Sequence, residues 1–246
     1  RYIYVVDKRQ ELHFTQVFRV AKKAGIVPAD RKMDFVGFGT MNGKDGKPFK
    51  TREGGVMRLE NLIADIDEEM FTKIVENRSV RDKDARDTAK IVGLAAIKYG
   101  DLSNQATKDY IFDVDRFTSF EGNTGPYILY TIVRIKSILN RYVEAGGNLE
   151  AGEILPASNG SEKNLMLQLS GFGSMIESAF EEKAPHKICA YIYEVSNAFN
   201  SFYHETKILS EENQAQKESY IRLLQLTKRV LETSIDLLGF EAPDKM

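Results

Sequence analysis

The pattern of apolar and polar positions changes along the chain, from short strand-like runs to long helical repeats. Residues 2–6 form a continuous run of aromatic and β-branched side chains, which is typical of a buried parallel strand. A helical stretch follows to about Ala24, and residues 34–38 predict a second buried strand. This order predicts one βαβ unit. Because a single unit cannot form a sheet, we expect further strands on its amino-terminal side.

From residue 58 onward the apolar residues recur every three or four positions, which predicts helices. Two amphipathic helices, one starting near residue 58 and one after residue 86, are expected to face a core as scaffold. Gly122, Gly125 and Pro126 then interrupt the pattern, and we place a domain boundary between residues 124 and 125. Beyond it, helices are predicted over residues 127–145, 162–182, 185–207 and 217–238. Several such helices with short connections indicate a bundle.

The first bundle helix carries two distinct faces, since each residue turns about 100° around the axis. The predicted core stripe consists of Ile128, Ile132, Ile135 and Leu139. A second face, about a third of a turn away, consists of Tyr127, Tyr130, Arg134 and Arg141. Two interpretations stay open for that face. It is a surface on which unstacked bases can stack beside a cation, or it is the amphipathic rim of the core.

Residues 197–204 of the third bundle helix are rich in aromatic and amide side chains. Phe199 and Phe202 lie on the face that we assign to the core. Asn200 and Tyr203 lie off that face, so Tyr203 can add another aromatic ring to the bundle surface.

The formal net charge of −2 hides an uneven distribution. Residues 8–58 hold twelve lysines and arginines against five acidic residues, whereas residues 125–246 hold twelve against sixteen. A nucleic acid bound to the second half is therefore not held by a broad basic surface. Stacking and local contacts would have to hold it.

Composition excludes several classes of site. With one cysteine, Cys189, the chain has no intramolecular disulfide, and its three histidines lack metal-ligand spacing. We expect an inert core thiol and no protein-bound metal. No run of eighteen apolar residues and no basic-then-apolar leader occurs, so we expect a soluble cytoplasmic protein, and a monomer.

A glycine-rich, cationic stretch over residues 42–55 follows the second strand. Its cations are Lys44, Lys47, Lys50 and Arg52. A mobile cationic loop beside an α/β sheet suits the charge of a transferred phosphoryl group. The alternative is a solvated turn, because the Walker spacing is absent. Asp7, Gln10 and His13 come just after the first strand, where open α/β sheets bind ligands.

Five ordered blocks resemble those of one family. They are Y-V-V-D-K-R-Q-E-L-H-F, G-K-D-G-K-P-F-K-T-R-E-G-G, F-E-G-N-T-G-P-Y, S-F-Y-H and L-L-G-F-E-A-P-D-K-M. Over essentially all its residues the chain resembles the carboxyl-terminal part of the arginyl-tRNA synthetases, which are class I enzymes. The resemblance implies a partial Rossmann-type α/β fold over residues 1–124. An all-α bundle of the DALR anticodon-binding type would follow over residues 125–246.

The resemblance also implies roles for individual residues. Residues 47–52 take the place of the K-M-S-K-S loop that clamps ATP phosphates, although the sequence departs from that signature, which leaves open which cation dominates. The implied catalytic residues are Lys47, Lys50 and Arg52. ATP, accompanied by Mg²⁺, is implied to contact His13, Lys50 and Thr51. L-arginine is implied to contact Gln10, and the anticodon of tRNA(Arg) is implied to contact Tyr127, Tyr130, Arg134, Tyr203 and Met246.

The same resemblance indicates what lies elsewhere in the family. The H-I-G-H signature and further arginine-binding residues precede the part of the family that this chain resembles, so we expect a fragment that is inactive alone. Two other interpretations stay open. The chain is a stand-alone tRNA-binding module, against which the cationic loop argues, or a helical interaction scaffold, which leaves the loop's cations unexplained.

Overall fold

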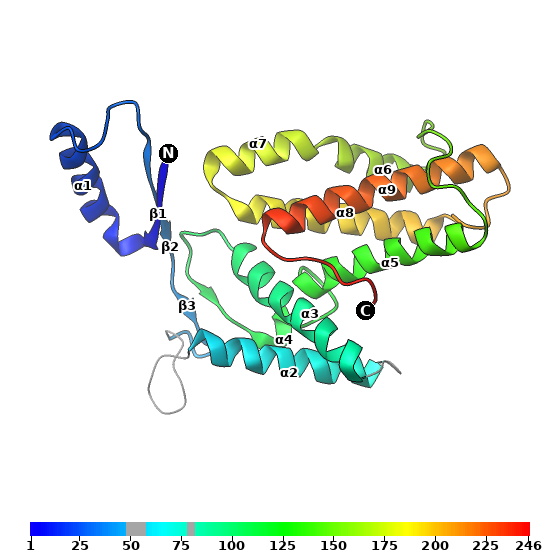
Figure 1. The fold of residues 1–246 in the computed structure, drawn as a ribbon, viewed down its shortest axis with the longest axis horizontal. Helices are drawn as coiled ribbons and strands as arrows, with labels where there is room; N and C mark the ends of the chain where they lie inside the picture. The colour runs from blue at the N-terminus through cyan, green and yellow to red at the C-terminus, as the bar shows by residue number, and fades with distance from the viewer. Residues whose placement is uncertain (48–57, 78–81) are drawn as a thin grey trace. The chain divides into compact units, whose positions relative to one another are not determined.

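The computed structural model of the protein describes residues 1–47, 58–77 and 82–246. The chain divides into two compact units (Figure 1). The first unit comprises Arg1–Met57 and Asn104–Asp113, and the second comprises Arg58–Ser103 and Val114–Met246. Each unit therefore contains two separate stretches of chain. Among the described residues, no helix combines the length and the apolar character that a membrane span requires.

The first unit begins with the predicted βαβ arrangement. Its elements are β1 (Tyr2–Asp7), the short 3₁₀ helix η1 (Lys8–Gln10), α1 (Glu11–Lys23) and β2 (Met33–Phe38). β1 and β2 pair in parallel, from Tyr2 opposite Met33 to Asp7 opposite Phe38. Phe14 of α1 packs between the rings of Tyr4 and Phe35, with centroid distances of 5.4 and 5.6 Å. Aromatic packing thus holds α1 against the two strands.

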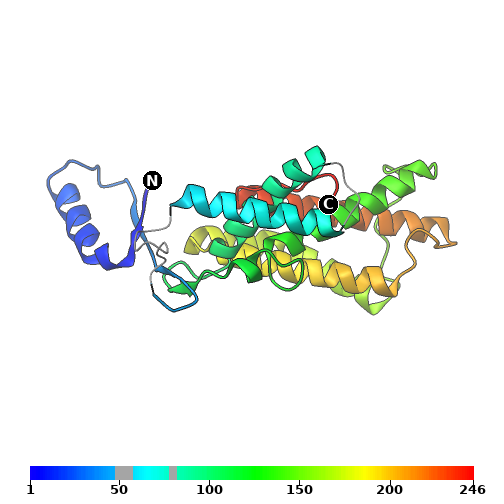
Figure 2. The same ribbon diagram turned by 90° about the horizontal axis from the view of Figure 1, so that it is seen from below.

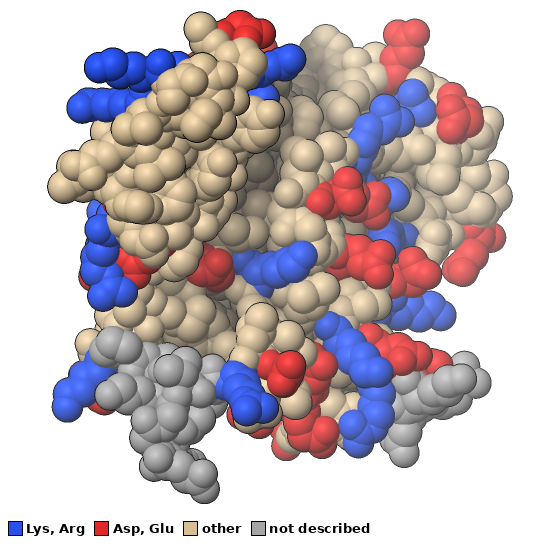
Figure 3. All heavy atoms as spheres, turned by 60° about the vertical axis from the view of Figure 1, so that its left-hand side comes forward, with Lys and Arg blue, Asp and Glu red and all other residues tan. Residues whose placement is uncertain are grey.

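The prediction that these strands are buried is wrong for β1, and in β2 it holds only for Gly37. Most side chains of β1 are exposed, and Val5 is 66% exposed. Within the described residues β1 has one strand partner, β2, and α1 packs on these strands through Phe14. Figure 3 shows one face of the molecule, on which areas without charged side chains lie next to lysines and arginines. A continuous apolar run is typical of a strand that is covered on both faces. The described residues cover β1 only in part.

A second, smaller strand pair completes the first unit. β3 (Met41–Asn42) pairs in parallel with β4 (Tyr110–Ile111), which follows almost 70 residues later. Just before β3, the Gly39 N–H donates to the Ala106 carbonyl over 2.8 Å. A Cβ atom at Gly39 would lie 2.3 Å from the Lys108 carbonyl oxygen, so the two backbones can approach this closely only at a glycine.

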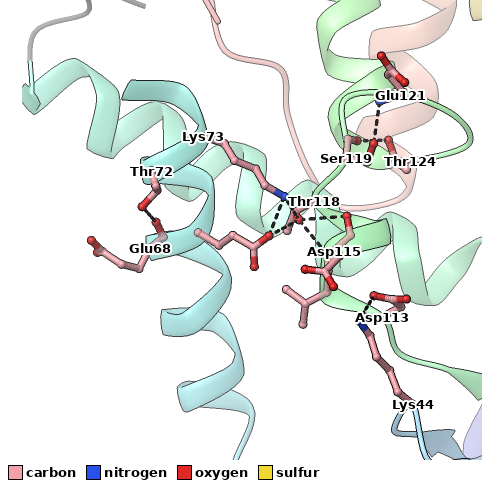
Figure 4. Close-up of polar contacts among 12 residues, drawn as sticks. Lys44, Glu68, Thr72, Lys73, Asp113, Asp115, Thr118, Ser119, Glu121 and Thr124 are labelled. Atoms are coloured by element: carbon pink, nitrogen blue, oxygen red, sulfur yellow. Dashed lines mark hydrogen bonds and ion pairs between the residues drawn. The ribbon is translucent and has the colours of Figure 1, made fainter. Parts of the chain in front are cut away.

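The second unit opens with the two predicted scaffold helices, α2 (Leu59–Asn77) and α3 (Asp82–Leu102). The second begins at Asp82, earlier than the predicted start after residue 86. The two helices pack against each other through fully buried side chains that include Ile66, Met70 and Val92. Behind the short helix α4 (Val114–Phe117), the buried Thr118 hydroxyl accepts from Lys73 Nζ at 2.6 Å and lies 2.7 Å from Glu69 Oε1 (Figure 4). This polar cluster ties α2 to the chain that leads into the bundle.

Five helices form the predicted bundle. They are α5 (Gly125–Glu144), α6 (Gly160–Ser170), α7 (Phe172–Glu182), α8 (Pro185–Glu205) and α9 (Gln214–Leu237). Figures 1 and 2 show α5, α8 and α9 running alongside one another, and these three pack pairwise. The Thr124 hydroxyl caps α5 by accepting from the Tyr127 N–H at 3.2 Å. The predicted core stripe of α5, from Ile128 to Leu139, is buried.

One prediction for the bundle needs correction. Residues 162–182 were expected to form one helix, and they form two, α6 and α7, with a break at Gly171. The Gly171 N–H donates to the carbonyl of Gln168, three residues back, which tightens the end of α6. Phe172 then packs on Tyr191 of α8 at 6.2 Å. The low helix propensity of glycine is consistent with an interruption at this residue.

The end of the chain folds back over α5. Lys136 Nζ donates to the carbonyls of Ala242 and Pro243, each over 3.3 Å. Lys98 Nζ donates to the Gly239 carbonyl. Phe240 and Met246 are buried, so the terminal segment belongs to the packed unit.

Candidate functional site

In the first unit, Asp7 stands at the carboxyl end of β1. Its Oδ1 accepts the Arg9 backbone N–H at 2.8 Å and so caps η1. The Arg9 side chain adds two bonds, Nε to Oδ1 at 2.9 Å and Nη2 to Oδ2 at 2.6 Å. Hydrogen bonds from the Arg9 side chain, then its backbone, lower the pKa of Asp7 to about 2. The Asp7 carboxylate is therefore ionised and is held in place by hydrogen bonds from Arg9, two residues further along the chain.

A second carboxylate at this edge, Asp109, was not singled out from the sequence. Its Oδ1 accepts the Thr40 N–H at 2.8 Å and lies 2.9 Å from Lys8 Nζ. The Thr40 hydrogen bond, followed by that of Lys8, lowers the pKa of Asp109. The contact spans 101 residues between Lys8 and Asp109, so no local spacing could have revealed it. It joins the end of β1 to the chain that enters β4.

Gln10 and His13 lie close to this edge, as predicted. Gln10 is the last residue of η1, and His13 lies in the first turn of α1 with its ring edge-on to Phe14 at 5.6 Å. Both side chains are exposed, so a ligand at the end of β1 can reach them. Their proposed contacts with arginine and ATP stay predictions.

The start of the cationic stretch is a tight turn. The Gly43 N–H donates to the Lys47 carbonyl at 2.8 Å, and Gly46 has a φ of +72°, which favours glycine. Lys44 forms an ion pair with Asp113 at 3.1 Å (Figure 4), and Lys47 is exposed. The remaining predicted loop residues, Lys50, Thr51 and Arg52, lie outside the described residues.

In the second unit, a groove of about 480 Å³ lies between α5, α8 and the end of the chain. Its lining includes four of the five residues predicted for the anticodon: Tyr130, Arg134, Tyr203 and Met246. They come from three parts of the sequence, and the folding back of the terminal segment brings Met246 to the groove. Tyr130 and Tyr203 are each 37% exposed, so part of each ring is open to a ligand.

Arg134 is the central side chain of this groove. Its guanidinium carbon lies 4.7 Å from the Tyr130 ring centroid and 5.2 Å from that of Tyr203. Both are cation–π distances. Its Nη1 also donates to Asn200 Oδ1 at 2.7 Å. Behind Tyr203, the buried Phe199 ring stacks at 6.1 Å, which keeps the tyrosine ring in place.

Tyr127, the fifth predicted residue, does not line the groove. Its hydroxyl lies 2.8 Å from Asn197 Oδ1 and accepts from Asn200 Nδ2 at 2.8 Å. The side chain is half-buried, and desolvation raises the pKa of Tyr127. Among the described residues it thus stands behind Arg134, as a rim residue would, whereas Tyr130 and Tyr203 face the groove.

The groove carries charges of both signs. Arg134, Arg141 and Lys245 line it together with Glu144 and Asp244. Lys136 Nζ lies 3.4 Å from Asp244 Oδ1 at the margin, where Asp244 is almost fully exposed and water screens the pair. With three cations and two carboxylates the lining is nearly balanced in charge, so stacking and a few directed contacts would have to hold a ligand.

Two expectations about reactive groups concern Cys189 and metals. Cys189 is buried, which confirms its predicted core position, and burial raises the pKa of its thiol to about 12. A raised pKa disfavours the reactive thiolate, in line with the expected inert thiol. Over residues 1–47, 58–77 and 82–246, no group of three or more His, Cys, Asp or Glu side chains is placed to hold a metal ion.

Two protein-family models together match most of the chain. Residues 1–114 match the catalytic domain of class I tRNA synthetases of the arginine type, and residues 128–246 match the DALR anticodon binding domain. The arginine–tRNA ligase of Agathobacter rectalis is 65% identical over 254 residues, covering 100% of this chain and 42% of that protein. That of Alkaliphilus oremlandii is 58% identical, with 99% and 41% covered. The chain thus spans about two fifths of the length of these relatives.

The chain is also similar to solved structures of arginyl-tRNA synthetases. The arginyl-tRNA synthetase of Thermus thermophilus superposes with a TM-score of 0.86 at 26% identity. The superposition covers 99% of this chain and 41% of the Thermus chain. Both the strand edge and the groove therefore lie in parts of the fold that this relative shares.

Proposed function

Because the chain belongs to the arginyl-tRNA synthetase family, we propose that it forms the carboxyl-terminal part of an arginine–tRNA ligase. In the first step of that reaction the arginine carboxylate attacks the α-phosphate of ATP, and pyrophosphate leaves. A hydroxyl of the terminal ribose of tRNA(Arg) then attacks the arginyl carbonyl, and AMP leaves. Such catalysis depends on positioning and charge stabilisation. The observation that carries the proposal is the groove of Tyr130, Arg134 and Tyr203 within the matched anticodon-binding segment.

The groove is proposed to bind the anticodon loop. The rings of Tyr130 and Tyr203 offer stacking surfaces for unpaired bases, and Arg134 offers hydrogen-bond donors beside them. Met246 adds an apolar contact at the same groove. The mixed charge of the lining fits this mode, because it gives stacking more weight than attraction to the phosphate backbone.

The first unit is proposed to supply part of the catalytic site. We assign its βαβ arrangement to the carboxyl-terminal part of a Rossmann-type fold, with Gln10 contacting arginine and His13 contacting ATP. Lys47, Lys50, Thr51 and Arg52 would act as the phosphate-clamping loop, and Mg²⁺ would accompany the ATP. Division into a catalytic part up to residue 124 and an anticodon-binding part from residue 125 belongs to the same proposal. Cytoplasmic location and a monomeric state stay predictions.

Binding of an RNA stem-loop tests the groove directly. The 246-residue chain should bind a stem-loop that carries an arginine anticodon more tightly than one whose middle anticodon base is changed. The logarithm of the affinity should fall only shallowly with the logarithm of the salt concentration, because few phosphate contacts are made. Equal binding of both stem-loops, or a steep salt dependence, would contradict the proposal.

Activity measurements test the cationic loop and separate the main alternative. The chain alone should not charge tRNA, and in a ligase that contains it Lys50→Ala should slow adenylate formation with little change in tRNA affinity. Loss of tRNA binding with normal adenylate formation would refute the loop assignment. A stand-alone tRNA-binding module predicts a different result, since it has no catalytic step for Lys50→Ala to slow.

A further inference from the structure

We propose that Asn200 is a positioning residue, which fixes the Arg134 guanidinium so that the groove can distinguish one RNA loop from another. This inference rests on the proposed function of the groove. Its basis is a chain of hydrogen bonds behind the groove, from Asn197 through Tyr127 and Asn200 to Arg134, in which each contact is 2.7 or 2.8 Å long.

The direction of these hydrogen bonds follows from the chemistry of their ends. A guanidinium has donors and no acceptor, so Asn200 must turn its Oδ1 toward Arg134. Its Nδ2 then faces the Tyr127 hydroxyl, which has to accept. The Tyr127 hydroxyl keeps its single proton for Asn197 Oδ1, which lies 2.8 Å away. Reversing the Asn200 amide would place two donors together at Arg134, so the relay holds one orientation.

The two tyrosine rings and the amide restrict Arg134 in complementary ways. The rings of Tyr130 and Tyr203 lie 4.7 and 5.2 Å from the guanidinium carbon and hold the group near both rings. They do not fix its rotation, since attraction to a ring face has little in-plane direction. The Asn200 bond takes up Nη1 and so sets which N–H groups remain for a ligand. A free arginine would lose rotational freedom on binding, whereas here that freedom is already restricted.

Asn200→Leu is the primary test, because leucine keeps about the same volume and removes both hydrogen bonds. Because the guanidinium loses the hydrogen bond that sets its rotation, affinity for the arginine stem-loop should fall about tenfold, which corresponds to about 1.4 kcal/mol. Discrimination against the stem-loop with the changed middle base should fall as well, and a purely structural residue would not alter that ratio. Tyr127→Phe keeps the ring, removes only the hydroxyl, and should give a smaller loss in the same direction.

A double-mutant cycle with Arg134→Ala decides whether Asn200 acts through Arg134. Asn200→Leu should cause no further loss in the Arg134→Ala background, since the group that it positions is gone. An equal loss in both backgrounds, or wild-type binding by Asn200→Leu, would overturn the positioning role and leave the proposed function standing. Wild-type binding by Arg134→Ala would overturn both. Thermal unfolding of each variant checks the fold, and if Asn200→Leu does not fold, the same cycle with Tyr127→Phe decides.

Discussion

The Tyr203 ring contacts both a core residue and a groove residue. Phe199 stacks against it from the buried core of the bundle, and Arg134 lies over it at the groove. A ring held in this way loses little further freedom when a base stacks on its open part. The contribution of Tyr203 to RNA binding should therefore be visible when this one side chain is removed.

Tyr203→Ala should weaken binding of the arginine stem-loop by about 1 to 3 kcal/mol, the range for one base stacked on an aromatic side chain. Fluorescence anisotropy with labelled RNA measures the change. Phe180→Ala is the matched control, because Phe180 is also an exposed aromatic residue, 67% exposed, and lies on α7 away from the groove lining. If both variants bind alike, the groove is not the base-stacking surface.

Asp7 gives a second prediction, which concerns pH. Its pKa is lowered to about 2, chiefly by the Arg9 side chain, so Arg9→Gln should return the pKa toward about 4. Because the folded-state pKa is below the unfolded value, the pair stabilises the wild-type fold at pH values above about 4. That advantage is lost as the pH falls through about 2. NMR titration of the Asp7 carboxyl carbon measures the pKa, and an unchanged value in Arg9→Gln would show that another group holds the charge.

The start of α5 is set by a close approach to α3. A Cβ atom at Gly125 would lie 2.4 Å from the Ala95 carbonyl oxygen, so the two helices meet where α5 has no side chain. Gly125→Ala must push the helices apart and should lower the free energy of unfolding by about 1 to 3 kcal/mol. Gly173 in α7 provides the matched control, since nothing lies within 4 Å of its added Cβ.

Gly173→Ala should instead raise the free energy of unfolding by less than about 1 kcal/mol, because alanine favours the helix and Gly173 lies in its first turn. Urea unfolding followed by circular dichroism measures both variants. Opposite signs are expected for the two glycines. A stable Gly125→Ala variant would mean that α3 and α5 are not in such close contact.

Helical periodicity made the bundle predictable, because its repeat is local. The spacing of Ile132 and the other buried residues of α5 indicates the core face of this helix, even when the helices that pack against it are unknown. The break between α6 and α7 was missed because an isolated glycine within a helical pattern is tolerated, so Gly171 alone does not show that a helix ends there. The exposure of β1 was missed for a related reason, since a strand's covering layers lie elsewhere in the sequence.

The candidate sites also contain residues that could be predicted from the sequence and contacts that could not. Tyr130, Arg134 and Tyr203 could be predicted from helical spacing together with family resemblance, and the groove unites them. The Lys8–Asp109 contact and the Asn200–Arg134 bond could not be predicted, because each joins residues 66 or more positions apart and rests on side-chain geometry. The sequence indicates which residue types lie on a helix face, whereas the direction in which each side chain points, and the partner that it reaches, depend on the fold.

The two compact units differ in how much they bury. In the described parts of the first unit, the fully buried residues are Gly37 and Phe112, whereas each long helix of the second unit contributes several. Buried apolar area is the main source of stability, so the first unit should open more readily than the second.

Hydrogen exchange measured by mass spectrometry tests this difference. Backbone amides of β1 and β2 should exchange faster than those in the middle of α5, α8 and α9, because local opening of the small sheet exposes little apolar surface. Equal protection in both units would indicate that the chain unfolds as one cooperative body. The described termini of each helix serve as internal references, since helix ends fray in either case.

The parallel pairing of β3 with β4 bears on how this protein can be rearranged by recombination. Within the first unit, β3 and β4 pair with each other, and in the sequence α2 and α3 are inserted between them. β4 belongs to the segment that follows residue 103. A crossover near residue 58 would give β3 and β4 to different descendants. Exchange of the first unit with a relative therefore has to carry residues 1–57 and 104–113 together, and the two segments are expected to be inherited as one block.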